Sequence, residues 1–284
     1  MKTIVIADIH QKTHIAEKVL AEEKSYDEVV FLGDWFDSFQ EPPVVSGFEE
    51  TCDYLRKLIT EHPQRKKFVF LPGNHDMGYI FNNNGPASRP VSRDNAYFCS
   101  GYTRTKAKKF RHAFYDKGCK DAFFLENFKP AHQSQGFTFS HAGIHPRHIP
   151  VGHTIKSLVE EILPEAWKNF RQLETWPHNW LLSGAGSARG GRCPVGGITW
   201  LDWHMEFVKD ENLGRQVMGH TKLLEPECRA MGTDAESWNL DTEQDYAVIT
   251  GGRLATKRLT GLSKDAPRRT ITMEEYLELS GFLS

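Results

Sequence analysis

The sequence contains few cysteines, no pairing pattern among them and no long hydrophobic run. Its five cysteines are scattered over 284 residues without a Cys-x-x-Cys pair, at positions Cys52, Cys99, Cys119, Cys193 and Cys228. This set argues against a disulfide framework or a thiolate zinc site, and it indicates reduced thiols in a cytoplasmic protein. No run approaches the roughly 18 apolar residues of a membrane helix. The N-terminal stretch MKTIVIADIH lacks the apolar core and cleavage pattern of a signal peptide, so neither a membrane partner nor secretion is expected.

The chain also lacks an excess of charge of either sign. It has 35 Lys and Arg residues against 37 Asp and Glu residues, so the overall charge indicates neither nucleic acid nor a membrane surface as a partner. With 39% hydrophobic residues, a chain of 284 residues can bury a substantial core. We expect a single domain over residues 1–284, in which two long excursions near 78–129 and 145–194 form functional loops or caps.

What the sequence does have is a series of short apolar runs bounded by turn residues. Six of them read as buried strands, at residues 3–7, 28–32, 67–71, 136–140, 216–218 and 246–250. Helical patterns at 15–23 and 48–60 alternate with the first three runs, which predicts βαβ units and a largely parallel sheet. The runs after about residue 195 are shorter, so we expect a second sheet of meander type. Further helices are expected at 154–169 and 273–279.

Residues of the kind that bind metals follow five of these runs, and histidine is frequent, with 13 in the chain. In order, the residues after the five runs are Asp8 and His10; Asp34 and Asp37; Asn74, His75 and Asp76; His141; and His220. If the strand geometry continues past the first run, Asp8 and His10 share one face. One at a time, these residues have ordinary explanations as helix caps, turn residues or satisfied polar groups. Turn chemistry gives no reason for histidine after four separate strands, so the repetition favours a metal site at the strand ends.

The motifs DIH, GDWFD, GNHD, SHAG and GHT, in that order, resemble the five signature blocks of the calcineurin-like metallophosphoesterases. The resemblance runs from about residue 3 to residue 250. It implies an α/β fold, a sandwich of two mixed β-sheets flanked by helices, with a dinuclear metal site at the strand ends. The metal ligands that it implies are, for the first ion, Asp8, His10 and Asp34 and, for the second, the bridging Asp34 with Asn74, His141 and His220.

The donor set and the motif residues left without a metal suggest a mechanism. Carboxylate, amide and imidazole ligands suit two divalent ions, with Mn²⁺ expected first and Fe or Zn²⁺ as alternatives. Such a positive site attracts phosphate, and a hydroxide that bridges the ions would be the nucleophile. The resemblance implies that His75 protonates the leaving oxygen and that Asp37 orients His75. We interpret Asp76 as a residue that supports the site or the structure around it. In the alternative interpretation, His75 lies in the outer shell of residues around the metal ligands and takes no part in proton transfer, and Asp37 is a helix cap.

Some details of the motifs favour one branch of the family. GHT at 219–221 lacks the second histidine of the GHxH found in many phosphodiesterases, and SHAG, GGITWLDW and NLDT are similar to the phosphoprotein-phosphatase-like branch. That branch has GDxxDRG where this chain has GDWFDSF, so Ser38 stands in place of a phosphate-binding arginine. GNHD in place of GNHE is a milder departure. The candidates for a replacement cation are loop arginines, which are otherwise ordinary solvated residues: Arg89, Arg93, Arg189 and Arg192.

The sequence therefore predicts a dinuclear-metal hydrolase of phosphoric esters. Among such enzymes, a phosphomonoesterase is the preferred prediction. Its expected substrate is a phosphorylated small molecule or a nucleotide rather than a phosphoprotein, and the alternatives are a dinucleoside-polyphosphate hydrolase and a phosphodiesterase. A different class is a nucleic-acid-binding module that uses segment 102–117, with its six Lys or Arg residues and its aromatics. We favour a helical cap for this segment, with Phe110 and Phe114 buried. The complete set of catalytic residues also favours the enzyme.

Overall fold

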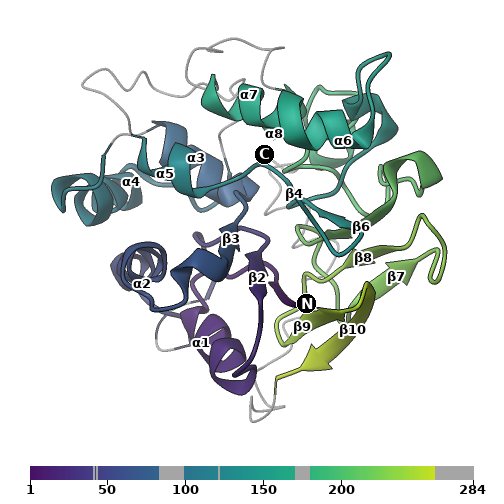
Figure 1. Ribbon diagram of the computed structural model, residues 1–284. Coiled ribbons are helices and arrows are strands. Elements are labelled where there is room, and N and C mark those ends of the chain that lie inside the picture. Colours follow the sequence, from purple (N-terminus) through teal and green to yellow (C-terminus); the bar gives the residue numbers. More distant parts are fainter. Residues whose placement is uncertain (41, 43, 83–98, 121, 170–179, 260–284) are drawn as a thin grey trace.

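Two five-stranded β-sheets lie face to face with helices outside them in the computed structural model (Figure 1). The structure describes residues 1–40, 42, 44–82, 99–120, 122–169 and 180–259. Within these residues, no helix has the length and apolar character needed to cross a membrane. The predicted fold class, an α/β sandwich of two mixed sheets with flanking helices, is confirmed.

The first sheet contains the predicted βαβ units. In pairing order its strands are β10 (Arg253–Arg258), β9 (Asp245–Thr250), β1 (Lys2–Ile6), β2 (Glu28–Phe31) and β3 (Phe68–Phe70). β1, β2 and β3 pair in parallel, and the intervening helices are α1 (Thr13–Glu22) and α2 (Phe48–Thr60). The hairpin of β9 and β10 adds to β1 in antiparallel fashion, so the sheet is mixed.

The second sheet differs from the expected meander. In pairing order its strands are β4 (His132–Ser134), β5 (Phe137–Phe139), β6 (Arg215–Met218), β8 (Ser237–Asn239) and β7 (Glu227–Arg229). β6 is parallel to both of its neighbours, and the last hairpin belongs to the first sheet. The meander prediction is wrong because parallel pairing needs crossover connections, and the short apolar runs after residue 195 carry no information about how they are connected.

Alternation along the central strands explains why these runs are apolar throughout. Ile4 and Ile6 of β1 belong to the hydrophobic cluster that includes residues of α1 and α2. Val5, between them, belongs to the cluster that includes Phe139 and Val217 of the second sheet. Since successive side chains of a strand point to opposite faces, the first sheet is buried on both.

Further helices surround the sheets. They are α3 (Asn74–Asn82), α4 (Arg104–Arg111), α5 (Phe123–Asn127), α6 (Ile155–Ser157), α7 (Leu163–Lys168) and α8 (Trp180–Ser183), with π-type turns at His112–Asp116 and Leu158–Ile162 and 3₁₀ turns at Arg65–Lys67, Pro146–His148, Ser187–Arg189 and Glu211–Leu213. The π-type turn between α6 and α7 makes one helical stretch, as predicted for 154–169. The helix predicted at 273–279 lies outside the described residues.

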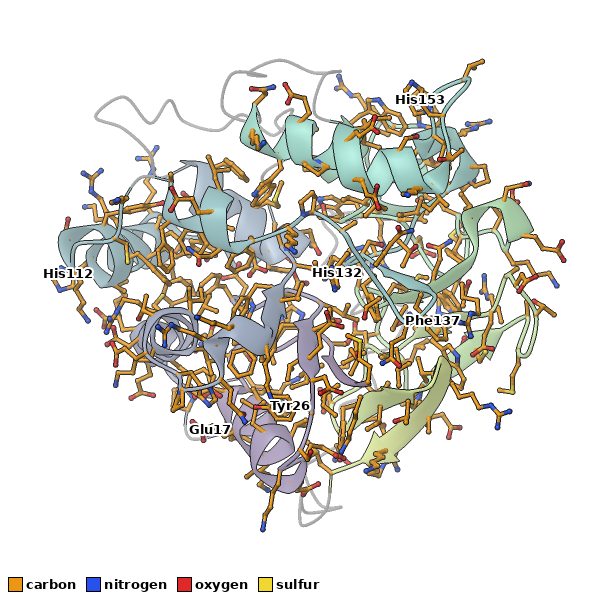
Figure 2. All side chains as sticks on the ribbon, in the orientation of Figure 1. Glu17, Tyr26, His112, His132, Phe137 and His153 are labelled. Atoms are coloured by element: carbon orange, nitrogen blue, oxygen red, sulfur yellow. The ribbon has the colours of Figure 1, made fainter. Side chains whose placement is uncertain are left out.

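Segment 102–117 forms the predicted helical cap. Phe110 of α4 and Phe114 of the following π-type turn are fully buried, and their rings pack 4.8 Å apart between centroids. Phe110 also stacks on Tyr79 of α3, which connects the cap to the helix that follows β3. Lys108 and His112 lie on the exposed side of the cap, and His112 points outward in Figure 2. The aromatic side chains of this segment are therefore used for packing.

Candidate metal centre

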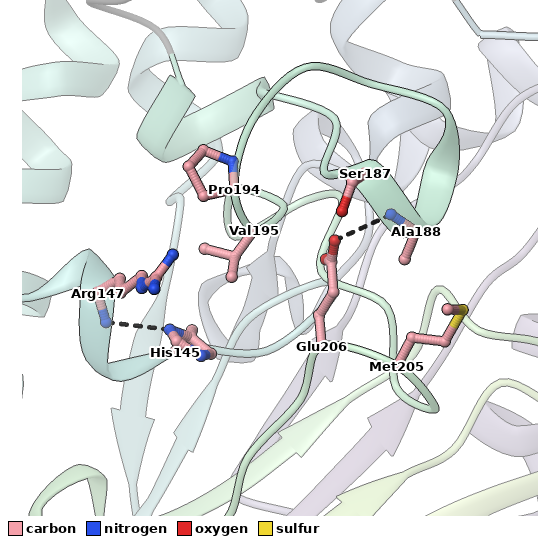
Figure 3. A pocket seen from close by; sticks show the side chains of 8 residues that line it. All are labelled: His145, Arg147, Ser187, Ala188, Pro194, Val195, Met205 and Glu206. Carbon is pink, nitrogen blue, oxygen red and sulfur yellow. Dashed lines mark hydrogen bonds between the residues drawn. The ribbon is translucent and has the colours of Figure 1, made fainter.

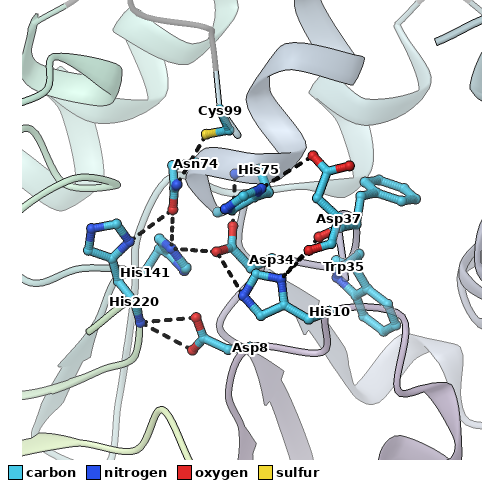
Figure 4. Close-up of polar contacts among 12 residues, drawn as sticks. Asp8, His10, Asp34, Trp35, Asp37, Asn74, His75, Cys99, His141 and His220 are labelled. Carbon is cyan, nitrogen blue, oxygen red and sulfur yellow. Dashed lines mark hydrogen bonds and ion pairs between the residues drawn. The ribbon is translucent and has the colours of Figure 1, made fainter. Parts of the chain in front are cut away.

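The polar residues that follow β1, β2, β3, β5 and β6 lie together at the edge of the two sheets where these strands end (Figure 4). Backbone contacts tie the loops to one another. His10 N–H donates to the Asp34 carbonyl at 2.6 Å, and Gly219 N–H donates to the His141 carbonyl at 2.7 Å. Between the sheets, His141 Nδ1 lies 2.9 Å from the carbonyl of Leu32. Both sheets thus contribute to one edge, the place where ligands bind in open α/β folds.

The first group of candidate ligands comes from the loops after β1 and β2. Donor atoms of Asp8, His10 and Asp34 lie within 4.8 Å of one another. His10 Nδ1 lies 3.1 Å from the carbonyl oxygens of Phe36 and Asp37; because carbonyls only accept, Nδ1 carries the proton and Nε2 keeps its lone pair. Burial lowers the pKa of His10 to about 4, which favours the neutral ring. Nε2 lies 3.5 Å from Asp34 Oδ2, so the two can share a cation.

The second group joins the two sheets and shares Asp34 with the first. Donor atoms of Asp34, His141 and His220 lie within 4.8 Å of one another. Asn74 Oδ1 lies 2.9 Å from His141 Nε2 and 2.9 Å from His220 Nδ1, so the amide oxygen faces the same point. Asp34 Oδ2 is 3.5 Å from the nearest ring nitrogens of both His10 and His141. The structure therefore brings together all six residues that the sequence proposes as ligands, with Asp34 between the two sets.

The surroundings of the carboxylates fit a bound cation. Asp8 and Asp34 are almost fully buried, and within the described part of the chain neither forms an ion pair with a lysine or arginine. Two glycines allow this burial: a Cβ at Gly73 would lie 2.1 Å from Asp34 Oδ1, and a Cβ at Gly219 would lie 1.9 Å from Asp8 Oδ2. Buried carboxylates are costly unless they are paired or coordinate a metal. The donor set, which contains no thiolate, suits a first-row transition ion.

The pKa values of two residues in the cluster, Asp8 and His141, are raised. Burial and then the charge of Asp241 raise the pKa of Asp8 well above its ordinary value. Burial would lower the pKa of His141, but the charge of Asp34 and a hydrogen bond to it outweigh burial and raise the pKa to about 10. For both groups the shift favours the protonated form. Divalent ions would supply this positive charge in place of the protons.

The loops that carry the site have an unusual backbone. Asp8, His10, Asp34, Asp37 and His220 all have positive φ angles, between 30° and 70°. This region is unfavourable for residues other than glycine, and such residues often occur at functional sites. The finding corrects the expectation that Asp8 and His10 share the face of a continuing strand. The strand ends at Ile6, and a left-handed turn rather than strand alternation brings the two side chains together.

His75 and Asp37 form a pair next to the candidate ligands. His75 Nδ1 lies 3.2 Å from Asp37 Oδ2, and His75 N–H donates to Asp34 Oδ1 at 2.9 Å. His75 belongs to neither ligand group, and Gly47 rather than Asp37 occupies the N-cap of α2. Burial lowers the pKa of His75, but the charge of Asp34 and the hydrogen bond to Asp37 outweigh it, so the net shift is upward. This environment favours the protonated ring, which can donate a proton.

Other side chains hold this pair and its loop in place. Asp76 accepts from Trp35 N–H at 2.8 Å and from Gly73 N–H at 2.9 Å, so it fastens the loop after β2 to the loop after β3. The sequence proposes this supporting role for Asp76, but not the contacts that Tyr79 and Lys106 make with Asp37. Tyr79 follows His75 by four residues on α3, a spacing that would have identified it.

Lys106 and Cys99 carried no such signal in the sequence. Lys106 is 69 residues from Asp37, and Cys99, whose sulfur lies 3.1 Å from Asn74 Nδ2, is 25 residues from Asn74. The packing of the cap brings Lys106 to the site, and Cys99 lies three residues before the cap.

The four candidate arginines fall into three cases. Arg89 and Arg93 lie outside the described residues. Arg189 lies next to a proposed metal ligand: its Nη2 donates to Thr221 Oγ1 at 2.7 Å, and its Nε lies 2.8 Å from Asp202 Oδ2. After burial, the charge of Arg189 is the largest influence that lowers the pKa of His220. Arg192 is exposed on the same loop. The contacts with Thr221 and Asp202 therefore hold Arg189 at the site.

A pocket of about 380 Å³ lies beside this loop and not at the metal centre (Figure 3). Its lining residues are His145, Arg147, Ser187, Ala188, Pro194, Val195, Met205 and Glu206. Glu206 accepts from the backbone N–H groups of Ala188, Gly196 and Asp202, at 3.3, 2.9 and 3.2 Å. The carboxylate therefore fixes the loop that carries Arg189, and no proposed ligand lines the pocket.

Comparisons with known proteins give relatives of the fold and a family. No curated protein matches the chain. Among solved structures, the cold-active protein-tyrosine phosphatase of a psychrophilic Shewanella species is similar in fold, with a TM-score of 0.58, 16% identity, and coverage of 91% of this chain and 80% of that chain. A protein serine/threonine phosphatase from Saccharomyces cerevisiae has a TM-score of 0.49 and 13% identity, and the match covers 93% of this chain and 81% of that one.

The family comparison extends over most of the chain. A family model described as calcineurin-like phosphoesterase matches residues 1–223 and thus includes all five motifs, from DIH to GHT. Two mixed sheets with a candidate cluster of metal ligands at the strand ends agree with that match. The chain belongs to the calcineurin-like phosphoesterase family.

Proposed function

We propose that the protein is a metal-dependent phosphomonoesterase with two divalent ions. The observation that carries the proposal is the position of Asp34, which belongs to both candidate ligand groups while the pair of His75 and Asp37 lies beside them and belongs to neither. A site with two cation positions and a separate proton donor suits hydrolysis of a phosphoric ester by water.

Two ions, Mn²⁺ by preference and Fe or Zn²⁺ as alternatives, would be held by Asp8, His10, Asp34, Asn74, His141 and His220. When bound, such ions hold a phosphate by their charge and make a water molecule nucleophilic at neutral pH. Hydrogen bonds to backbone carbonyls orient some of these donors. His10 illustrates this, since its Nδ1–H is held by backbone carbonyls and its Nε2 remains available.

His75 acts on the leaving group in this proposal. Its Nδ1 is held by Asp37, so its Nε2 can donate a proton to the oxygen of the departing alcohol. A general acid must be protonated before the reaction, and the raised pKa of His75, in which the charge of Asp34 and the bond to Asp37 outweigh burial, favours that form.

The substrate that we propose is a phosphorylated small molecule or a nucleotide. Arg189, fixed beside His220 by Asp202 and Thr221, would contact the phosphate, because guanidinium binds phosphate oxygens in pairs. A phosphoprotein is less favoured because Ser38 occupies the position of the arginine in GDxxDRG. The five free cysteines suit a reducing compartment, so we expect a cytoplasmic enzyme without a membrane partner.

A substrate panel tests the proposal. The metal-free protein and the protein reconstituted with Mn²⁺ are assayed on an aryl phosphomonoester, an aryl phosphodiester, a phosphopeptide and a dinucleoside tetraphosphate. We expect hydrolysis only with metal, with the highest kcat/KM for the monoester. Faster turnover of the diester or of the tetraphosphate would assign one of the alternative reactions. Full turnover without metal would contradict the proposal.

A second measurement addresses the nucleic-acid module. Binding of single-stranded and duplex oligonucleotides is measured over a salt series, because true backbone binding falls steeply with salt. We expect no binding at physiological salt. Tight, salt-dependent binding that Lys108→Met weakens would support the module instead, since Lys108 lies on the exposed side of the cap.

A further inference from the structure

The carboxylate of Asp37 is the point where the cap meets the proton-donating pair. Asp37 is fully buried, and its two oxygens have different partners. Oδ2 lies 3.2 Å from His75 Nδ1. Oδ1 accepts from Tyr79 OH at 2.6 Å and from Lys106 Nζ at 2.9 Å. One oxygen is therefore held by two donors, and the other remains for the imidazole.

The side chain of Lys106 is itself held in a defined place. Thr103 caps α4 by accepting from Lys106 N–H at 3.1 Å, which fixes the residue in the first turn of the helix. The ammonium group also donates to the Gly101 carbonyl at 2.9 Å and lies 5.8 Å from the centre of the Phe48 ring. The backbone at Gly101 packs against Asp37 so closely that a Cβ there would lie 2.9 Å from Asp37 Cβ.

Lys106 also supplies a charge that the neighbouring sequence lacks. Ser38 follows Asp37, so no cation is adjacent to it in the chain, and the Ser38 hydroxyl accepts from Gln40 N–H at 3.0 Å. A buried carboxylate that binds a histidine through one oxygen needs its charge balanced and its rotation restricted. The side chain of Lys106 is one-quarter exposed, and its ammonium group supplies both from a segment 69 residues away.

We propose that Lys106 is a positioning residue for the proton donor His75 and that it acts through Asp37. The proposal rests on the function proposed above, in which His75 protonates the leaving oxygen. With Lys106 present, Asp37 keeps Oδ2 directed at Nδ1, and the ring keeps Nε2 directed at the substrate side. Without Lys106, Oδ1 retains only Tyr79, the carboxylate can turn, and the imidazole loses its fixed orientation. The docked cap is thus part of the catalytic geometry.

The experiment compares Lys106→Met with Lys106→Arg and with the matched control Lys108→Met, an exposed lysine of the same helix. For each variant, kcat and KM are measured over phosphomonoesters whose leaving alcohols span a wide range of pKa, and metal content and melting temperature are recorded. We expect Lys106→Met to slow esters of poor leaving alcohols by about 10–100-fold, the scale of a misplaced catalytic group. Nitrophenyl esters should slow far less, metal content should stay normal, and Lys106→Arg should restore most of the rate. Lys108→Met should have no effect.

A double variant tests the route through Asp37. Lys106→Met added to Asp37→Asn should cause little further loss, because both changes act on the same pair. Full additivity would overturn the proposal. A rise in KM with an unchanged leaving-group dependence would make Lys106 a phosphate contact and would also overturn it.

Two further variants separate other causes of failure. Phe110→Ala removes a buried ring of the cap that stacks on Tyr79, and it measures how far general loosening of the cap lowers the melting temperature. If Lys106→Met lowers the melting temperature as much as Phe110→Ala and slows all esters equally, Lys106 only supports the fold. His75→Asn tests the underlying function. A leaving-group dependence in His75→Asn but not in Lys106→Met would refute the positioning role alone, and its absence from both would refute the proton-donor role of His75.

Discussion

The metal side and the proton-donor side of the site are built in different ways. The proposed ligands come from loops directly after strands of both sheets, so the strand ends themselves set their positions. The proton-donor side also depends on Tyr79 of α3 and on Lys106 of α4, and Lys106 contacts Asp37 because the cap packs on the sandwich. The comparison teaches that the two sheets alone position the proposed metal ligands, whereas the cap of residues 102–117 is needed to complete the proton-donor side. Changes to the cap should therefore affect proton donation and spare metal binding.

The largest effect is expected from Asp34→Asn. Asp34 is the only residue present in both ligand groups of the described part of the chain, and asparagine tolerates its positive φ angle, so the variant changes charge more than backbone. We expect loss of both ions and a fall in kcat of about 10⁴-fold on every ester, since bound ions contribute several kcal/mol. Metal analysis and turnover measure the result. Normal metal content in a dead variant would contradict the shared role of Asp34.

The next effect is expected from His75→Asn, which isolates the proton-donor side. Because His75 belongs to neither ligand group, both ions should remain and the fold should be near normal. Esters of poor leaving alcohols should slow by about 10²–10⁴-fold, whereas nitrophenyl esters should slow much less. The measurement is kcat over a leaving-group series together with elemental analysis. An equal fall in kcat for all esters, together with loss of metal, would make His75 a metal ligand and not the proton donor.

A smaller effect is expected from Arg189→Ala, with Arg192→Ala as its control on the same loop. Arg189 is fixed by Asp202 and Thr221 beside His220, whereas Arg192 is exposed. Loss of a charged contact to phosphate should cost about 1.5–3 kcal/mol and appear as a higher KM for a monoester dianion. A neutral-tailed diester should suffer less, and Arg192→Ala should change little. Equal KM values in the two variants would leave the phosphate without an identified arginine.

The smallest effect concerns Glu23, which lies on neither side of the site. Its buried carboxylate accepts from Tyr246 OH at 2.9 Å and from Lys257 Nζ at 2.6 Å. Burial would raise its pKa, but hydrogen bonds from Lys2, Lys257 and Tyr246 outweigh burial and lower the pKa from 4.5 to about 2. A lowered pKa in the folded state means that the contribution to stability is complete above pH 4.5 and is lost as pH falls towards 2.

Unfolding of the metal-free protein at a series of pH values measures this contribution. Glu23→Gln should flatten the loss of stability with acid, while Lys24→Met, at the neighbouring exposed position, should not. Identical acid profiles of Glu23→Gln and the parent protein would show that other carboxylates dominate.

Much of the site follows from the sequence because its residues stand directly after apolar runs. Asp8, Asp34, Asn74, His141 and His220 each follow a strand, and the ends of neighbouring strands meet. The buried Phe110 and Phe114 of the cap follow from their spacing in the same way. These features depend on the order and spacing of neighbouring residues, which can be read from a single sequence.

The rest depends on connections and packing that local pattern does not contain. The parallel pairing of β6 with β8 needs a crossover that the short runs do not reveal. The left-handed turns at Asp8 and His10 replace an extended strand. The contact of Lys106 with Asp37 depends on where the cap docks, because the basic run of segment 102–117 looks like an ordinary solvated face.

The positive φ angles at the site have a consequence for the evolution of the sequence. Five of the proposed functional residues hold a backbone conformation that glycine or asparagine would adopt more easily. Selection for thermal stability alone would therefore favour replacing these residues. The resulting variants would be inactive but would have a higher melting temperature than the active enzyme. Laboratory evolution for heat resistance should retain an activity screen at every round, because the positions where stability is easiest to gain include those that carry the chemistry.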